Sequence, residues 1–276
     1  MAGTTLGGLA LGDHVCLLHG GPVGRSGVIE AFILPALDSG DKVICCTTQV
    51  TPAVVAEALE AADGRAREAL RSGQFVITDA RESYLPSGAF DAERVIDDWR
   101  EELDRIRDAG YPGVRVIGDM NWAAEPVPGT ERLAWYEAEM NRVFAAGFAC
   151  VVCLYERGTF SPARLRQYIQ AHPGTVEPGV PRIPQLRLRY TSDPRGLAIA
   201  GEADLANRAA LAAVLAGLPH DVPGEGPLTI DVSGLTFADV GTAAALLRCT
   251  REIPQLRLTG LSPYLSDLLD MVAQAT

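Results

Sequence analysis

An α/β fold is predicted, in which a parallel sheet with flanking helices is followed by a smaller α/β domain. Apolar, strand-like runs alternate with helical patterns through the first 155 residues, which is typical of βαβ units. A stretch rich in proline and glycine interrupts this alternation at residues 173–184. The length of 276 residues also exceeds that of most single domains, so two domains are expected.

Five short apolar runs are expected to form the parallel sheet of the first domain. Each is nearly continuous in apolar residues, as strands buried on both faces are. In chain order they are residues 14–18, 42–47, 75–79, 114–118 and 150–155.

Helices are expected between these strands, at residues 26–37, from Pro52 onward, at 91–109 and at 132–146. Pro52 suits the first turn of a helix, where its missing N–H costs no hydrogen bond. The helix at 91–109 is rich in acid and base pairs at helical spacing, which indicates a solvated outer face.

The segment 173–184, PGTVEPGVPRIP, has four prolines and no periodicity, and therefore predicts a linker. We place the first domain at residues 1–179, the linker at 180–185 and the second domain at 186–276. The second domain is expected to have strands at 186–190, 197–201, 228–231 and 256–259, and helices at 207–216, 242–251 and 262–273.

Composition and charge exclude some classes of function. A net charge of −11 and a pI near 4.9 argue against a nucleic-acid partner, because phosphates require basic patches. No apolar stretch reaches the ~18 residues of a membrane span, and the N-terminus has no basic flank or long apolar region of a secretory signal. A cytoplasmic protein without a membrane partner is expected.

The six cysteines lie mostly inside apolar runs, as reduced and buried thiols do. Cys150 and Cys153 have CxxC spacing, but they fall in an expected central strand and no second CxxC pair accompanies them. A zinc or redox pair is therefore not expected from these two residues.

Residues 228–243, LTIDVSGLTFADVGTA, place a strand, a polar crossing and an alanine-rich helix in succession. Residues 231–239 resemble the signature loop of STAS domains, the fold of bacterial anti-sigma factor antagonists. The family pattern is Asp-x-Ser-x-(Leu/Val)-x-Phe-x-Asp-Ser-Ser-Gly. The three residues after Asp239, which are Val240, Gly241 and Thr242, depart from it.

The STAS resemblance implies a partner-binding surface at Ser233, Asp239, Gly241 and Thr242, and an anti-sigma factor or related kinase as the partner. In the family, phosphorylation of a serine two residues after the aspartate breaks the complex through charge repulsion. Gly241 holds that position and cannot accept a phosphate. Thr242 and Ser233 are the nearby hydroxyls that could replace it, and Thr242 could equally serve only as a helix cap.

Several motifs of the first half resemble the MEDS domain, a sensory module of bacterial regulators. They are GDHVCLLH (12–19), GYPGVRVIGDMNWA (110–123), CLYERGTFSPARL (153–165) and AHP (171–173), and together they cover most of residues 6–179. The resemblance implies a RecA-like fold related to P-loop ATPases, with a small-molecule signal as the ligand.

The relation to P-loop ATPases raises the question of nucleotide binding. A working loop has the pattern Gly-x-x-x-x-Gly-Lys-Ser/Thr, in which the lysine reaches the outer phosphates. Here His19 replaces the first glycine, and the other residues of this degenerate phosphate loop are Gly20, Gly21, Gly24, Arg25 and Ser26. The sequence favours a structural loop, although a nucleotide stays open as an alternative and the cofactor is unknown.

His14 and Cys16 are two residues apart on one strand, so their side chains share a face and could converge on a ligand or metal. His19 follows across the next turn, Asp119 ends a neighbouring strand where a magnesium-holding acid would stand, and Trp122 could supply an apolar wall. These five residues are the predicted ligand-binding set. The metal is left open, and a buried cysteine beside a hydrogen-bonded histidine is the structural alternative.

Together these features predict a cytosolic regulator without catalytic activity, in which a MEDS sensor controls a STAS module that binds another protein. Two alternatives stay open. One is a nucleotide-binding RecA-like enzyme, an ATPase or kinase, and the other is a STAS scaffold within a signalling complex. The identity of the signal and the contact between the domains are not determined by the sequence.

Overall fold

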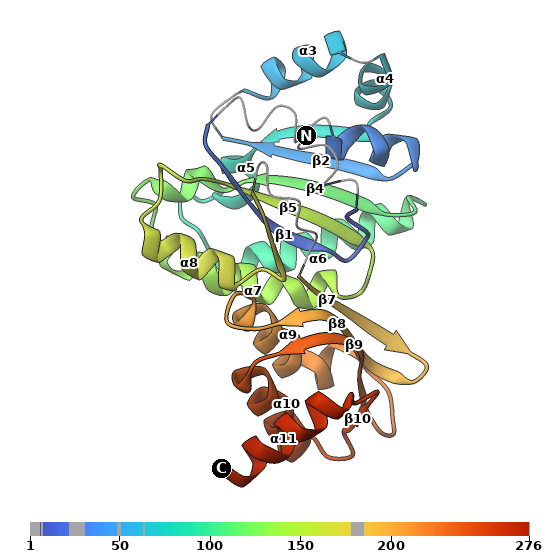
Figure 1. Ribbon diagram of the computed structural model, residues 1–276. Helices are drawn as coiled ribbons and strands as arrows, with labels where there is room; N and C mark the ends of the chain where they lie inside the picture. The colour runs from blue at the N-terminus through green and yellow to red at the C-terminus, as the bar shows by residue number, and fades with distance from the viewer. Residues whose placement is uncertain are drawn as a thin grey trace.

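The computed structural model describes residues 6, 8–21, 31–48, 51–62, 64–177 and 185–275. Two α/β units follow one another along the chain, each with its own sheet and apolar core. Figure 1 shows the first unit, in blue to yellow, above the second, in orange and red. The predicted fold class, a parallel sheet with flanking helices followed by a smaller α/β domain, is confirmed.

Within the described ranges, six strands form the sheet of the first unit in the order β3-β2-β4-β5-β1-β6, and all neighbouring pairs are parallel. Most of their side chains are buried, because helices cover both faces. The strands are β1 His14–His19, β2 Lys42–Thr47, β3 Phe75–Asp79, β4 Val114–Asp119, β5 Ala149–Glu156 and β6 Gly174–Val176.

Strand β6 lies inside the Pro-rich segment 173–184, which the sequence predicts to be an irregular linker. For its first residues that prediction is wrong, because β6 pairs in parallel with Val15, Cys16 and Leu17 of β1. A sheet edge offers backbone partners to any extended chain beside it, whatever the local residue pattern. Residues 178–184, which include most of the predicted 180–185 linker, lie outside the described residues.

Helices cover both faces of the first sheet (Figure 1), and an apolar layer of buried side chains lies on each face. One joins alternate strand side chains to α6, α7 and α8, and the other joins the remaining strand side chains to residues 31–38, α3 and α4. The helices are α3 Pro52–Ala62, α4 Gly64–Ser72, α5 Ala80–Tyr84, α6 Ala92–Asp108, α7 Leu133–Phe144 and α8 Pro162–Gln170, with short 3₁₀ turns η1 Met120–Ala124 and η2 Thr130–Arg132.

The described part of the second unit has a four-stranded sheet in the order β10-β9-β8-β7. Strands β7 and β8 form an antiparallel hairpin, and β9 and β10 join in parallel. Three helices bury their apolar faces in its core. The elements are β7 Leu186–Ser192, β8 Arg195–Ala203, β9 Thr229–Ala238, β10 Arg257–Thr259, α9 Arg208–Asp221, α10 Val240–Glu252 and α11 Pro263–Ala275. No helix in the described ranges is long and apolar enough to cross a membrane.

The polar residues after position 231 were expected to form a loop, but they form a strand instead. Strand β9 continues to Ala238, and α10 begins at Val240 rather than at Thr242. The helix starts earlier because the Asp239 carboxylate accepts a hydrogen bond from the Thr242 N–H at 2.7 Å and so caps the first turn.

The two units contact each other directly. Helix α7 packs against α9, where Ala138, Ala171 and Ala213 form a small apolar cluster. Beside it, the Arg142 guanidinium donates two hydrogen bonds to the Asp221 carboxylate, at 2.7 and 2.9 Å. These groups, with the contacts of Asp13 and Pro173 described below, are called the domain interface.

Candidate functional site

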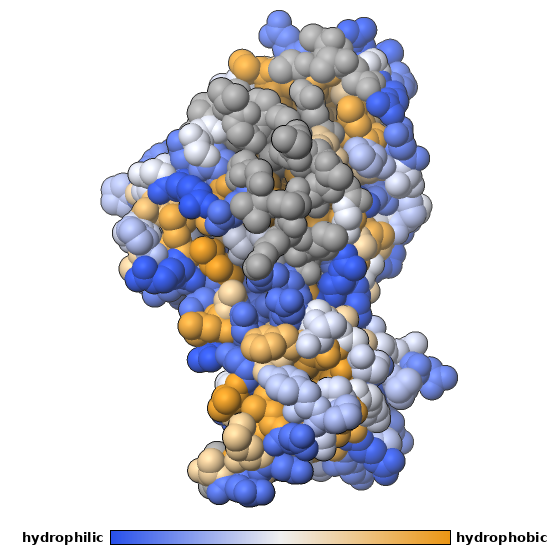
Figure 2. Space-filling view, in the orientation of Figure 1, coloured by the Kyte–Doolittle hydropathy of each residue, from blue (hydrophilic) through white to orange (hydrophobic). Residues whose placement is uncertain are grey.

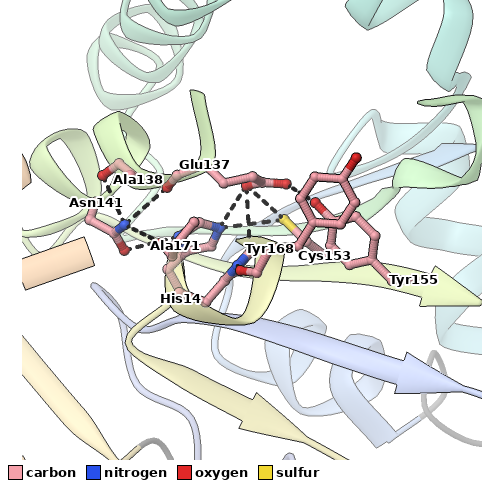
Figure 3. Close-up of polar contacts among 9 residues, drawn as sticks. His14, Glu137, Ala138, Asn141, Cys153, Tyr155, Tyr168 and Ala171 are labelled. Atoms are coloured by element: carbon pink, nitrogen blue, oxygen red, sulfur yellow. Dashed lines mark hydrogen bonds and ion pairs between the residues drawn. The ribbon is translucent and has the colours of Figure 1, made fainter. Parts of the chain in front are cut away.

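Four side chains that commonly bind metals meet between the sheet of the first unit and α7. They are His14, Glu137, Cys153 and His172, each at most 3% exposed. One ligand atom of each lies within 4.8 Å of the other three. Figure 3 shows His14 and Cys153 on the strands with Glu137 approaching from the helix. We call these four residues the buried cluster.

Each residue of the buried cluster is placed by the element that carries it. His14 begins β1, and Cys153 lies in β5, the strand paired with β1. Glu137 and Asn141 are one turn apart on the buried face of α7. His172 follows the end of α8 and precedes β6.

The Glu137 carboxylate is the centre of the buried cluster. Its Oε2 atom lies 3.3 Å from His14 Nε2, 3.5 Å from His172 Nε2 and 3.6 Å from Cys153 Sγ. The Cys153 thiol is also 3.4 Å from His14 Nε2. The other carboxylate oxygen accepts a hydrogen bond from the Tyr155 hydroxyl. Three elements and a turn are therefore tied to one buried carboxylate.

Hydrogen bonds fix the orientation of both histidine rings. The Asn141 amide nitrogen donates to the carbonyls of Glu137, Ala138 and Ala171, so its oxygen faces His14 and accepts from the Nδ1–H at 3.0 Å. The His172 Nδ1–H donates to the Tyr168 carbonyl at 2.7 Å. In the neutral form, both rings therefore turn the lone pair of Nε2 toward Glu137.

Burial and mutual charge set the protonation of the buried cluster. Burial acts to raise the pKa of the Glu137 carboxyl, but His172, His14 and Tyr155 outweigh it and lower that pKa. Burial and the neighbouring His14 lower the pKa of His172 to about 4. Burial and the Glu137 charge raise the pKa of the Cys153 thiol well above its ordinary value. At neutral pH these three groups are a carboxylate, a neutral imidazole and a thiol.

A cavity of about 10 Å³ adjoins His14, Glu137 and Cys153. This volume is about that of one water-sized sphere. Aromatic side chains, among them Trp99, form much of its remaining wall. Trp99 also lines a larger concavity of about 320 Å³ next to β2, β3 and α6, which has the size of a small-molecule site.

Of the five predicted ligand residues, the structure brings His14 alone into the buried cluster. Cys16 faces the same layer and pairs in register with Cys153. Burial and then the Glu137 charge raise the pKa of the Cys16 thiol, yet Cys16 is not one of the four clustered ligands. It borders the site.

His19, Asp119 and Trp122 lie at the opposite end of the strands from His14. His19 ends β1, Asp119 ends β4, and Trp122 follows in η1. The two ends of a six-residue strand are about 16 Å apart, so the five predicted residues do not form one group. Trp122 packs against Tyr84 in the apolar layer.

The carboxyl ends of the strands are the usual ligand position of open α/β sheets. Asp119 is held there by the Asn121 backbone and side-chain amides, at 3.2 and 2.7 Å, and by the Thr48 N–H at 3.3 Å. Of the predicted phosphate loop, Gly20 and Gly21 are described at this edge, whereas Gly24, Arg25 and Ser26 lie outside the described residues. This position is called the carboxyl edge.

Acidic side chains gather at the carboxyl edge. Asp79 ends β3, Asp119 ends β4 and Glu156 ends β5, with the Glu156 carboxylate beside Gly21. Carboxylates at this position repel the phosphates of a nucleotide. A nucleotide at this edge would therefore need a cation between its phosphates and these carboxylates, and Asp119 stands where a magnesium ion would be held.

In the second unit, the predicted partner-binding residues surround the start of α10. Asp239 caps the helix and forms an ion pair with the half-exposed Arg208 at 3.1 Å. Ser233 is exposed on β9. The Thr242 side chain is buried, and its hydroxyl donates to the Ala203 carbonyl at 3.0 Å. Of the two candidate hydroxyls, that of Ser233 is the accessible one.

Large apolar side chains flank the start of α10. Phe237 is 44% exposed and Val240 is 57% exposed, on either side of Asp239. Figure 2 shows apolar surface on the lower unit, between hydrophilic residues, where α10 and α11 lie. Exposed apolar groups rimmed by polar ones are typical of protein-binding surfaces.

Sequence reasoning missed Glu137, Cys153 and His172 as members of one site. A local signal existed for Glu137, because it and Asn141 fall on the same helical stripe as Leu133, Met140 and Phe144. A charged residue on an apolar stripe predicts a buried polar contact. Cys153 had no such signal, since its apolar strand predicts a core thiol.

The spacing of Cys150 and Cys153 does not make a paired site. Residues three apart on a strand face opposite sides, so Cys150 packs in the layer of α3 and α4 while Cys153 faces α7. Cys153 enters the buried cluster alone.

Two family models match the chain. The model described as the methanogen/methylotroph, DcmR sensory domain (MEDS) matches residues 13–173. The model described as Mlab, STAS domain matches residues 186–274. Both resemblances inferred from sequence motifs are thus confirmed, and the MEDS match covers more than half of the chain.

A transcriptional repressor, DcmR of Methylorubrum extorquens (strain DSM 6343 / CIP 106787 / DM4), is 24% identical to this chain over 170 residues. The chain spans 61% of the length of that relative, and the match covers 61% of this chain.

Two solved structures are similar in part. The KaiC-like protein PH0186 of Pyrococcus horikoshii OT3 is 14% identical, with a TM-score of 0.45 over 70% of this chain and 79% of that chain. The flagellar accessory protein FlaH of Methanocaldococcus jannaschii is 12% identical, with a TM-score of 0.46 over 70% of this chain and 87% of that chain.

Proposed function

The chain belongs to the MEDS family, and from this premise we propose that it is a cytoplasmic signalling regulator without catalytic activity. The MEDS domain senses a signal, and the STAS domain binds an anti-sigma factor or a related kinase. The signal changes the STAS surface that the partner meets. The observation that carries this proposal is that residues close in sequence to the buried cluster form the domain interface.

The chain segments that carry three cluster residues also carry the domain interface. Asp13, next to His14, accepts hydrogen bonds from Arg187 and Arg189 of β7, the latter at 2.8 Å. Pro173, next to His172, accepts from the Leu186 N–H at 3.2 Å. A movement of either histidine therefore displaces a backbone that contacts the second domain.

Helix α7 makes the third connection. Glu137 faces the cluster, and Arg142, a little more than one turn later, forms the two hydrogen bonds to Asp221 of α9. Asp221 also accepts a hydrogen bond from the Tyr190 hydroxyl at 2.8 Å. A rigid helix that is anchored at both sites transmits a rotation from one to the other.

The larger concavity next to β2, β3 and α6 is the proposed place for a small-molecule signal. Its volume suits an organic ligand, and its lining combines the bases Lys42 and Arg105 with the acids Asp98 and Glu102 and the apolar surface of Trp99. Because Trp99 also lines the small cavity at the cluster, a ligand that moves this ring alters the packing around Glu137.

We propose that the STAS domain is an anti-sigma factor antagonist that is not released by phosphorylation at the usual position. Gly241 has no hydroxyl there, and the Thr242 hydroxyl is buried and already donates to Ala203. Control then comes from the MEDS domain. The partner meets Asp239, the exposed Phe237 and Val240, and the first turn of α10.

The test uses the full-length chain and an anti-sigma kinase from the same cell. The lifetime of the complex is measured with and without ATP, and phosphate is mapped by mass spectrometry. We expect the complex to persist in ATP. Stoichiometric phosphate on Ser233 or Thr242, together with dissociation, would show that the switch has moved to that hydroxyl. A Ser233→Ala chain serves as the matched control, because it removes the accessible hydroxyl.

Two outcomes would replace the proposal. A scaffold role is supported if no kinase binds and the chain is instead recovered in a stable assembly whose composition does not change with any signal. ATP turnover by the chain supports a RecA-like enzyme. His19 and Arg25, in place of the first glycine and the lysine of a functional phosphate loop, argue against turnover.

A further inference from the structure

The ligand atoms of the buried cluster are arranged as the corners of a metal site. Zinc binds nitrogen and oxygen at about 2.0 to 2.2 Å and sulfur at about 2.3 Å, so the corners of its tetrahedron lie about 3.3 to 3.8 Å apart. Four of the separations within the cluster are 3.3, 3.4, 3.5 and 3.6 Å. The remaining pairs are within 4.8 Å.

The buried cluster has more acceptors than donors. When both imidazoles are neutral, His14 Nε2, His172 Nε2 and Glu137 Oε2 all present lone pairs to the same space, because each ring carries its single hydrogen on Nδ1. The Cys153 thiol has one proton and can satisfy one of them. His172 Nε2, which is fully buried, has no hydrogen-bond partner among the described residues. Such an arrangement leaves buried polar atoms unsatisfied unless a cation lies between them.

We propose that His14 Nε2, His172 Nε2, Cys153 Sγ and a Glu137 carboxylate oxygen together bind one divalent transition-metal ion of the zinc class. Two imidazoles and a thiolate favour zinc or a similar ion over magnesium and calcium, which prefer oxygen. On binding, the Cys153 thiol releases its proton to solvent. The thiolate and the carboxylate then balance the charge of the ion.

The surroundings of the cluster are those of a metal site. The Asn141 amide and the Tyr168 carbonyl hold the two histidines through Nδ1, and the Tyr155 hydroxyl holds the free oxygen of Glu137. Partners of this kind orient metal ligands and fix the tautomer of each histidine. The neighbouring cavity of about 10 Å³ accommodates an ion or a water molecule and is too small for an organic ligand.

Four protein ligands leave no open position for a substrate, so the ion joins elements rather than performing chemistry. It links the start of β1, α7, β5 and the turn before β6. The consequence for the second domain rests on the proposed function, because it requires the domain interface to transmit the change. Metal binding itself is measured on the chain without any partner.

The experiment uses the full-length chain, freed of metal by a chelator under reducing conditions and titrated with Co²⁺ as a spectroscopic probe. We expect one ion per chain, intense visible bands of a tetrahedral site, a thiolate-to-cobalt charge-transfer band in the near ultraviolet, and displacement by Zn²⁺. A folded chain that binds no Co²⁺ or Zn²⁺ stoichiometrically overturns the proposal.

Paired cysteine variants test the assignment of the ligands. Cys153→Ser should remove the charge-transfer band and weaken binding at least about 100-fold, more than the loss of an outer-shell partner does. Cys150→Ser, the matched control from the opposite face of the same strand, should keep both. An unchanged charge-transfer band in Cys153→Ser refutes the site.

Two further measurements cover a variant that fails to fold. X-ray absorption of the zinc-loaded wild-type chain should give one sulfur at about 2.3 Å and three nitrogen or oxygen ligands at about 2.0 to 2.2 Å. Zero or several sulfurs would contradict the assignment. Glu137→Gln, which keeps the size of the side chain, should weaken Co²⁺ binding while circular dichroism reports the fold. Binding that is unchanged in this folded variant also contradicts it.

Discussion

The buried cluster of the MEDS domain and the start of α10 in the STAS domain are both built around a carboxylate, but they differ in exposure. Glu137 is 1% exposed and has partners from β1, β5 and the turn before β6, whereas Asp239 is 24% exposed and caps the helix that it precedes. A closed site can respond only to an ion, a proton or a movement of its walls. An open helix terminus can meet a whole protein. The difference in burial agrees with the proposed division of roles, in which the first site senses and the second binds a partner.

Among substitutions of the two carboxylates, the larger loss of stability is expected at the buried one. Glu137→Ala should lower the free energy of unfolding by about 3 to 5 kcal/mol, because it leaves the Tyr155 hydroxyl and the Cys153 thiol buried without their acceptor and opens a cavity beside the two histidines. Urea unfolding followed by circular dichroism measures the change. A loss below about 1 kcal/mol would mean that the cluster is not a structural centre of the domain.

The connection between the two sites is tested at Arg142. The hydrogen bonds to Asp221 raise the pKa of the Arg142 guanidinium above its ordinary value, although burial acts to lower it. Both side chains are largely buried. Arg142→Ala should cost about 2 to 3 kcal/mol, the range of charge-assisted hydrogen bonds. It should also uncouple partner binding from the state of the first domain.

Arg71→Ala is the control for Arg142→Ala, because Arg71 forms an exposed pair with Glu68 on α4, which packs on the opposite face of the sheet from α7. Its effect on stability should be below about 1 kcal/mol. Equal effects of the two substitutions would exclude the interface as the route between the sites.

Asp239→Ala tests the exposed site, and a smaller effect on stability is expected there. Loss of the helix cap should cost about 1 kcal/mol. If the partner presents a basic group, its affinity should fall about 10-fold, within the roughly 1 to 3 kcal/mol of a charge-assisted hydrogen bond. Calorimetric titration with the partner measures this change. A loss of stability as large as that of Glu137→Ala would remove the distinction between the two carboxylates.

The smallest effect is expected at the carboxyl edge, the third acidic region. We predict no ATP hydrolysis by this chain with magnesium, because His19 and Arg25 replace the first glycine and the lysine of a functional phosphate loop. A phosphate-release assay measures it. Turnover that Asp119→Ala abolishes would make the MEDS domain an enzyme and would move the functional site to the opposite end of the sheet.

Much of the fold could be predicted from local patterns. Five of the strands in the first sheet follow from apolar runs, because strands covered on both faces need apolar side chains at nearly every position. Strand β6 could not be predicted, since its pairing depends on the exposed edge of β1 rather than on its own residues. The start of α10 was misplaced because the cap at Asp239 looks like part of the preceding loop.

The candidate site was predictable only in part. His14 was identified because a strand face and a family motif point to it. Its companions were not, because His14 is 139 residues from Cys153 and 127 from Asn141 along the chain. Asp119 and Trp122 were wrongly grouped with His14. In a parallel sheet, a residue that begins one strand and residues that end or follow another lie at opposite ends, so the predicted strand bounds already separate them.

The sequence by itself determined the family of each half, the parallel α/β architecture, the acidic character of the chain and the absence of a hydroxyl at Gly241. These properties depend on residue type and local periodicity. Only the tertiary structure decided that Glu137, Cys153 and His172 join His14, that the Thr242 hydroxyl is buried, and that the two domains are in contact. Convergence of this kind depends on strand order and on the rotation of α7 over the sheet, which packing between distant segments fixes.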